Sequence, residues 1–275
     1  MKIVNYSYKG QRPQLGIVEE DTVSRISFEI GMLELIRRGV LPTKTSERHP
    51  LSDITFKAPL MPGKIVAVGR NYADHAAELG NAASGELPVL FAKFPSSVIG
   101  DGEAIQWDSA DTTQVDWEGE LAVIISKRAR HIDEADAMNY VFGYTVVNDV
   151  TARDFQASEE QWIRAKSMDT FCPMGPCVVT RDEISDPHDL TITTKVNGEA
   201  MQSASTALMI HKIPALIAHI SHFLTLNAGD VILTGTPAGV GKGMNPPRFL
   251  ADGDTVSVTI DGIGEISNPC RAIDS

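Results

Sequence analysis

The sequence predicts a β-rich α+β fold with two parts, a small N-terminal domain of residues 1–60 and a larger domain of residues 61–275. Two observations support this fold class. Short apolar runs of strand length recur along the whole chain, and glycine, proline, asparagine or aspartate bounds most of them. Only a few stretches have the length and apolar spacing of a helix.

The N-terminal domain begins with three short segments that alternate apolar and polar residues, at 2–6, 15–18 and 22–26. Such alternation is typical of strands with one buried face. An apolar helical piece follows at 30–38, and then a polar loop. Two prolines and a glycine within residues 58–63 interrupt regular structure, so we place the domain boundary there.

The larger domain begins with a buried strand at 65–68 and a short helix at 71–80. Asn71 is a good N-cap for this helix, and Gly80 is suited to its C-terminal end. His75 and Glu78 lie three residues apart and share one helix face. A glutamate beside a histidine favours a general base, although a solvated surface pair would look the same. The small residues at 80–85 would let the helix move as a lid.

Further elements follow in order along the chain. Asn197 and Gly198 are typical of a type I′ hairpin turn. A long apolar stretch at 206–226 predicts a helix, and its three histidines have no acidic partner, which favours core or surface roles for them. The remaining predicted strands lie at 89–93, 121–125, 140–147, 231–234, 255–260 and 264–266.

Three acidic residues lie beside two of these strands. Glu118 and Glu120 are two residues apart, so in a strand they project to the same side, and Asp149 ends the strand at 140–147. Three converging carboxylates repel one another unless a cation neutralises them. The pattern therefore predicts a metal site. The alternative is a pair of edge-strand charges in solvent, but Ala122 and Ile124 continue the same face, which favours the rim of a pocket.

Polar residues after Asp149 have the spacing to reach the same site. Arg153 and Gln156 are one helical turn apart, and Lys166 follows. A lysine in an acidic site can stabilise a carboxylate or an enolate, although a lone lysine is more often a surface charge. The glycine-rich residues 235–243 match neither common nucleotide-binding loop, so we interpret them as the wall of a small-molecule pocket.

Charge and composition exclude several classes of partner. The formal net charge is -12, which disfavours nucleic acid and anionic membrane surfaces. No stretch reaches the roughly 18 apolar residues of a membrane span. The chain has 3 cysteines, an odd number that suits a reducing compartment, and we expect a cytoplasmic location.

Taken together, several motifs resemble the fumarylacetoacetate hydrolase family across residues 62–269. No acid lies at 68–72, where larger members have a further aspartate ligand, so the chain is similar to the smaller branch with three carboxylates. The motifs are GRNY at 69–72 with ADH at 73–75, EGEL at 118–121, ND at 148–149 with TARD at 151–154, NGE at 197–199, and GD at 229–230 followed by TGTP at 234–237 and Gly241.

The resemblance implies a mixed β-sandwich roll, assembled as a homodimer, with Mg²⁺ or Mn²⁺ bound by three carboxylates. The implied metal ligands are Glu118, Glu120 and Asp149. The implied catalytic residues are His75 and Glu78 on a lid, together with Lys166. The implied substrate-binding residues are Arg70, Tyr72, Arg153, Gln156, Gln202 and Thr236.

The favoured function is metal-dependent hydrolysis of a carbon–carbon bond in an acylpyruvate-type 2,4-diketo acid, such as a fumarylpyruvate-like intermediate of aromatic catabolism. The metal would stabilise an enolate, and His75 would deprotonate the attacking water. Two alternatives use the same site: decarboxylation of oxaloacetate or a related 2-oxo diacid, and isomerisation of a 2-hydroxy-dienoate. A non-catalytic small-molecule or metal-binding protein is a further alternative of a different class.

Overall fold

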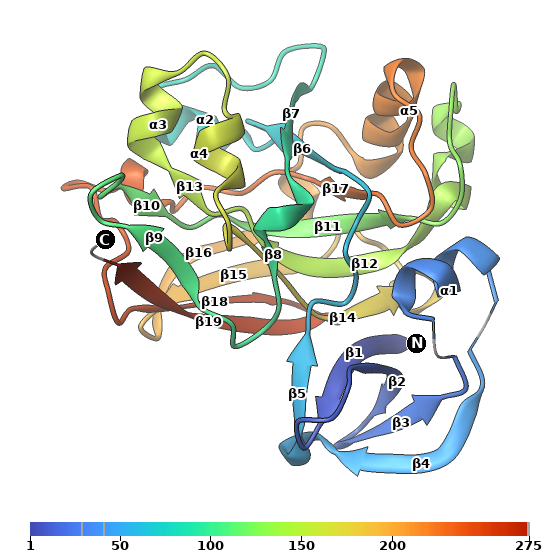
Figure 1. Ribbon diagram of the computed structural model, residues 1–275. Coiled ribbons are helices and arrows are strands. Elements are labelled where there is room, and N and C mark those ends of the chain that lie inside the picture. The colour runs from blue at the N-terminus through green and yellow to red at the C-terminus, as the bar shows by residue number, and fades with distance from the viewer. Residues whose placement is uncertain (29, 41, 274–275) are drawn as a thin grey trace.

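The structure is a computed structural model, and it describes residues 1–28, 30–40 and 42–273. The fold is α+β and β-rich, as the sequence predicts (Figure 1). Within the described residues the strands form two mixed sheets, of 12 and 5 strands, and one pair. The sheets combine parallel and antiparallel neighbours: β6 and β17 are parallel, whereas β11 and β12 are antiparallel.

The large sheet runs from the N-terminal part of the chain to the candidate site. In spatial order its strands are β4 (Lys44–Pro50), β3 (Thr22–Ile26), β2 (Gln14–Glu19), β1 (Lys2–Tyr8), β14 (Cys172–Thr180), β12 (Val141–Asn148), β11 (Gly119–Ile125), β17 (Val231–Leu233), β6 (Ile65–Gly69) and β7 (Val89–Lys93). Off this path, β5 (Ile54–Lys57) pairs with β1, and β8 (Val98–Ile99) pairs with β14. Every residue of β11 is buried, because this strand lies in the middle of the fold.

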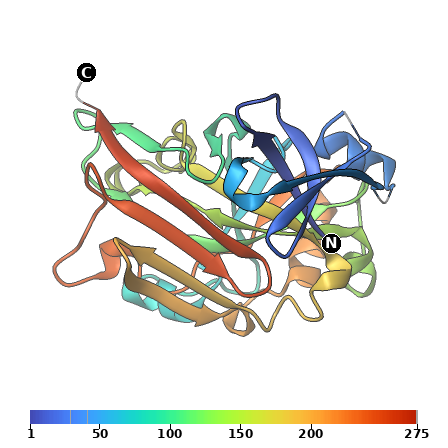
Figure 2. The same cartoon turned by 90° about the horizontal axis from the view of Figure 1, so that it is seen from below.

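The smaller sheet covers the large sheet opposite β11, β12 and β14 (Figure 2). Its strands, in spatial order, are β16 (Glu199–Ser205), β15 (Thr191–Val196), β18 (Thr255–Ile260), β19 (Gly264–Ile273) and β9 (Ile105–Asp108). The remaining pair joins β10 (Val115–Asp116) to β13 (Thr151–Ala152). Apolar residues from the facing sheets, among them Trp117, Leu121, Val258 and Ile266, form one buried cluster. Glycine at 119 is required here, because a Cβ would overlap Thr194 of β15.

Five α-helices are present in the described part of the chain. They are α1 (Met32–Arg38), α2 (Ala73–Glu78), α3 (Arg153–Ser158), α4 (Ile163–Ser167) and α5 (Ile213–Phe223). Short 3-10 turns occur at Leu51–Asp53, Pro95–Ser97, Glu134–Tyr140, Arg181–Glu183, Thr206–Leu208 and Gly241–Gly243. Helices α2, α3 and α4 gather at one end of the large sheet (Figure 1). This end carries the candidate site.

Two predicted helices differ from the observed ones. The N-cap of α2 is Tyr72 without a side-chain cap, so Asn71 does not cap it. The C-terminal end is as predicted: Gly80 has φ 68°, and its N–H bonds to the carbonyl of Ala77. Helix α5 begins at Ile213, well after 206, because Pro214 suits the first turn of a helix and would interrupt a longer one.

The N-terminal part, drawn in blue in Figure 1, is joined to the larger part by strand pairing. Strand β1 pairs with β14, with Lys2 opposite Val179 and Ile3 opposite Val178. The sheet therefore continues across the expected domain boundary, and the division after residue 60 stays a prediction. None of the described helices is both long and apolar enough to cross a membrane.

Candidate active site

The three acidic residues converge, as their spacing predicted. In the register of β11 and β12, Gly119 lies opposite Asn148, which places Glu118 beside Asp149. The backbone N–H of Asp149 donates to the carbonyl of Glu118 at 2.8 Å, and Oδ1 of Asn148 accepts the N–H of Glu118 at 2.9 Å. Glu118, Glu120 and Asp149 each offer a carboxylate oxygen within 4.8 Å of the others. All three side chains are buried.

Three cations neutralise two of these carboxylates. Lys166 Nζ lies 2.7 Å from both Glu118 and Asp149. Lys93 Nζ approaches the other oxygen of Asp149 at 2.7 Å, and Arg153 lies 2.8 Å from Glu118. Burial alone would raise the pKa of Glu118, but the charges of Lys166 and Arg153 hold it at about 2. Burial would likewise lower the pKa of Lys166, yet the two carboxylates raise it. Glu118 and Lys166 are therefore charged at neutral pH.

Glu120 lacks such a partner. No ion pair within the described ranges includes it, and its carboxylate accepts the N–H of Gly235 at 2.7 Å. Burial, followed by the charges of Asp149 and Glu118, raises its pKa well above the ordinary value. A divalent cation among the three carboxylates would neutralise the negative charge that raises the pKa of Glu120. Three carboxylate oxygens are ligands for a hard cation, so the residues present fit a divalent metal ion.

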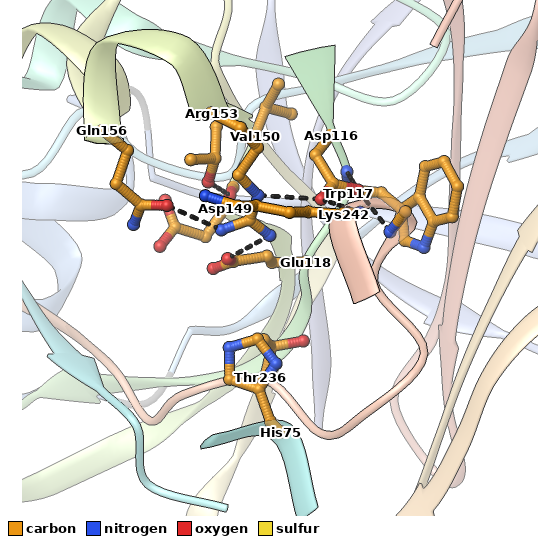
Figure 3. Close-up of polar contacts among 12 residues, drawn as sticks. His75, Asp116, Trp117, Glu118, Asp149, Val150, Arg153, Gln156, Thr236 and Lys242 are labelled. Carbon is orange, nitrogen blue, oxygen red and sulfur yellow. Dashed lines mark hydrogen bonds and ion pairs between the residues drawn. The ribbon is translucent and has the colours of Figure 1, made fainter. Parts of the chain in front are cut away.

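The predicted dyad lies on α2. His75 Nδ1 is 2.9 Å from Oε1 of Glu78, and Oε2 of Glu78 accepts the N–H of Gly239 at 2.9 Å. With the carboxylate accepting Nδ1–H, this network assigns the lone pair to Nε2. Figure 3 shows the His75 ring across an open space from the carboxylate of Glu118. The His75 imidazole and the acidic cluster thus face the same space.

This space is a cavity of about 280 Å³. Eight of the predicted site residues line it: Arg70, His75, Glu118, Glu120, Arg153, Gln156, Lys166 and Thr236. Lys242, Phe91, Trp162, Leu79 and Asn81 are among the other lining residues. Asp149 and Glu78 do not line the cavity. Asp149 forms an ion pair with Lys166, and Glu78 hydrogen-bonds to His75, and both of these partners line it.

Two predicted substrate contacts do not line the cavity. Tyr72 is 2% exposed, and its hydroxyl has no partner within the described residues. Gln202 accepts the N–H of Gly119 at 2.9 Å and donates to Thr236 Oγ1 at 2.7 Å. Gln202 therefore supports the backbone beside Glu118 and Glu120, and nothing in its position brings it to a substrate.

Sequence reasoning missed two buried charges that support the site. Asp116 Oδ2 lies 2.8 Å from Nε of Arg153, and the same carboxylate accepts the N–H groups of Gly241 and Lys242 at 2.7 and 3.0 Å. Asp116 precedes Glu118 by two residues, so the alternation of acids at 116, 118 and 120 was an available signal. Lys93 is the last residue of an apolar strand, and no local pattern indicates that it pairs with Asp149, 56 residues further along the chain.

Fold and site together define a β-rich protein with a buried carboxylate cluster suited to a divalent metal and a histidine–glutamate pair opposite. The family model for the C-terminal domain of fumarylacetoacetate (FAA) hydrolase matches residues 64–271. The chain belongs to the fumarylacetoacetate hydrolase family.

Curated relatives and solved structures agree with this assignment. The oxaloacetate tautomerase YisK of Bacillus subtilis is 48% identical over 80% of this chain and 74% of its own. The mitochondrial oxaloacetate tautomerase fahd2 of Xenopus laevis is 43% identical over 98% of this chain and 90% of its own. Both relatives are enzymes by name.

Among solved structures, a fumarylacetoacetate hydrolase from Exiguobacterium antarcticum has a TM-score of 0.88 at 41% identity, covering 99% of this chain and all of its own. A maleylpyruvate hydrolase from Sphingobium sp. SYK-6, solved with manganese(II) and pyruvate, has a TM-score of 0.80 at 30% identity, covering 99% of each chain. The manganese bound in this structural relative is consistent with a divalent metal site at the carboxylate cluster of this chain.

Proposed function

We propose that this chain interconverts the keto and enol forms of oxaloacetate, or of a similar four-carbon 2-oxo diacid. The observation that carries the proposal is the position of His75 across the cavity from the three carboxylates, which pairs a proton acceptor with a metal-binding cluster. The cavity, at about 280 Å³, lies below the roughly 300 to 1,000 Å³ typical of drug-sized ligands, which favours a small substrate. The names of the relatives add support.

Mg²⁺ or Mn²⁺ is the cofactor that we propose, held by Glu118, Glu120 and Asp149. Carboxylate oxygens suit both ions. A bound divalent ion would polarise the 2-oxo group and favour the negative charge that develops when a neighbouring carbon loses a proton. Lys166 would orient the carboxylates of Glu118 and Asp149, and Arg153 would orient that of Glu118.

The proton transfer is the task that we assign to His75. Its Nε2 atom takes a proton from C3 of the keto acid, the C3–H electron pair becomes the C2–C3 double bond, and the C2–O π pair moves onto the 2-oxo oxygen. The imidazolium then returns the proton to that oxygen, which gives the enol and regenerates His75. The reverse steps convert enol to keto. Glu78 stabilises the positive imidazolium that forms, because its carboxylate already accepts Nδ1–H.

Hydrolysis of an acylpyruvate, the reaction that the sequence favoured, is the second candidate. The same dyad can deprotonate a water molecule, and the maleylpyruvate hydrolase has the same fold. Decarboxylation of oxaloacetate and isomerisation of a 2-hydroxy-dienoate need the same metal-binding cluster. Two curated relatives, of 43% and 48% identity, are named oxaloacetate tautomerases, which supports our ranking of the proton transfer first.

One set of parallel assays tests this ranking. The metal-loaded chain is mixed with enol oxaloacetate, and loss of the enol absorbance and release of pyruvate are followed together; acetylpyruvate and maleylpyruvate cleavage are measured separately. We expect rapid enol loss with little pyruvate, activity with Mg²⁺ and Mn²⁺, and none beyond the metal-only background with a chelator. Cleavage of an acylpyruvate faster than the enol loss would reverse the ranking.

We also propose that the chain acts as a homodimer in the cytoplasm. Light scattering of the purified chain tests the first part, and fractionation of its native cells tests the second. A monomer that retains full activity would refute the dimer as the working form.

A further inference from the structure

The cavity contains more positive charge than its carboxylates require. Four cations line it, Arg70, Arg153, Lys166 and Lys242. Two of them, Arg153 and Lys166, form ion pairs with acidic side chains. Across residues 1–28, 30–40 and 42–273, no ion pair or side-chain hydrogen bond includes the Lys242 ammonium or the Arg70 guanidinium. These two groups are available to a ligand.

The backbone around Lys242 is firmly held. The N–H groups of Gly241 and Lys242 donate to Asp116, which also binds Arg153, and Gly239 on the same loop donates to Glu78. The loop is thereby tied to both the acidic cluster and the dyad. Burial and then the nearby charge of Arg153 lower the pKa of Lys242, against the opposing charge of Asp116. An anion beside it would relieve both effects.

Arg70 lies just before α2, the helix that carries His75 and Glu78, and its side chain has an unsatisfied hydrogen-bond donor. It has φ 55°, in the left-handed region, which non-glycine residues rarely adopt. The Ser84 hydroxyl lies 3.0 Å from the carbonyls of both Gly69 and Arg70 and holds this backbone. Arg70 Nε is buried without a partner in the described structure. A buried donor left unpaired costs free energy, and a bound anion would satisfy it.

We propose that Lys242 and Arg70 form a subsite for the second carboxylate of the substrate, which makes the site selective for 2-oxo dicarboxylic acids over monocarboxylic ones. The 2-oxo acid end lies at the metal-binding cluster, and the distal carboxylate meets the two unpaired cations. Without them, a dianion would approach a chain of formal net charge -12 unfavourably. This inference rests on the proposed function, because it names the substrate class for the same cavity.

Binding of unreactive ligands to the Mg²⁺-loaded chain tests the subsite by calorimetry. Malate carries a distal carboxylate, and oxalate carries only the metal-binding end. We expect Lys242→Met to weaken malate binding about tenfold or more, the loss typical of a charged hydrogen bond, and to change oxalate binding less than twofold. Arg70→Met should behave alike, and Lys242→Arg should retain most of the malate affinity. Lys195→Met, at an exposed position, is the control.

Equal weakening of malate and oxalate, or no change in either, overturns the subsite. Melting temperatures of the variants separate loss of folding from loss of binding. The binding measurement is independent of turnover. Selective loss of malate affinity supports the subsite even if the chain does not convert enol oxaloacetate. If the chain converts enol oxaloacetate but the variants bind malate normally, the subsite is refuted and the proposed function stands. In the active enzyme the same variants should raise KM for oxaloacetate much more than they lower kcat.

Discussion

His75 Nδ1 lies 2.9 Å from Oε1 of Glu78, so a carboxylate on the same short helix holds the imidazole. The second oxygen of Glu78 accepts the N–H of Gly239, which fixes the carboxylate in turn. This chain of contacts leaves Nε2 of His75 directed at the cavity that the acidic cluster also lines. The imidazole is thus oriented without a bound ligand, which would reduce the cost of reaching the reactive geometry in the proposed proton transfer.

Replacement of Glu78 tests that orientation. Glu78→Gln keeps the shape but removes the charge that stabilises the imidazolium, so we expect kcat to fall about 10- to 150-fold, the equivalent of about 1.5 to 3 kcal/mol for a hydrogen bond to a charged group. Asp74→Asn makes the same chemical change at an exposed position of the same helix and should leave kcat unchanged. Equal kcat values for the two variants would contradict the role of Glu78.

Because the pKa of Glu120 is raised, we predict that the stability of the metal-free chain depends on pH. This pKa is raised well above 4.5, so the folded chain retains a proton that the unfolded chain has released. Stability from this group is complete below about pH 4.5 and is lost as the pH rises toward the raised pKa. Glu118, with its pKa lowered to about 2, contributes stability that is lost only as the pH falls below 4.5.

In a chelator, the melting temperature of Glu120→Gln should therefore fall less between pH 5 and pH 8 than that of the wild-type chain. Added Mg²⁺ should stabilise the wild-type chain increasingly as the pH rises, because binding requires the ionised carboxylate. Glu20→Gln, an exposed control, should follow the wild-type chain. Parallel curves for Glu120→Gln and the wild-type chain would show that the Glu120 carboxyl does not titrate in this window.

Lys93 predicts a large loss of stability on substitution. Lys93 is 1% exposed and its ammonium pairs with Asp149, so Lys93→Met leaves that carboxylate paired with Lys166. We expect the free energy of unfolding in a chelator to fall by about 3 to 5 kcal/mol. Lys57→Met breaks the half-exposed pair with Glu103 and should cost about 0 to 1 kcal/mol. Urea denaturation measures both, and similar losses would be evidence against a structural role for the buried pair.

Local signals account for the parts of the fold and site that the sequence predicted. The turn at Asn197 and Gly198 has φ 53° and 82° and joins β15 to β16, as a type I′ turn requires. The convergence of Glu118 and Glu120 follows from strand alternation alone. Each of these features depends on residues that are neighbours in sequence.

Features set by distant partners were missed or wrong. Asn71 has the composition of an N-cap, but its amide donates to the carbonyls of His211 and Thr234, and its Oδ1 accepts the N–H of His211. These contacts join residues 140 and 163 positions apart in the sequence, so no local pattern indicates them. The same holds for Lys93, whose partner Asp149 lies on another strand.

Proton exchange at C3 of oxaloacetate tests the central claim most directly. Nuclear magnetic resonance in D₂O with Mg²⁺ follows the loss of the C3 proton signal, and a sample without the chain gives the background. We predict that the wild-type chain accelerates exchange, and that His75→Ala slows it about 10²- to 10⁴-fold while the Kd for Mg²⁺ is unchanged. Exchange by His75→Ala at the wild-type rate would contradict the assignment of His75 as the base.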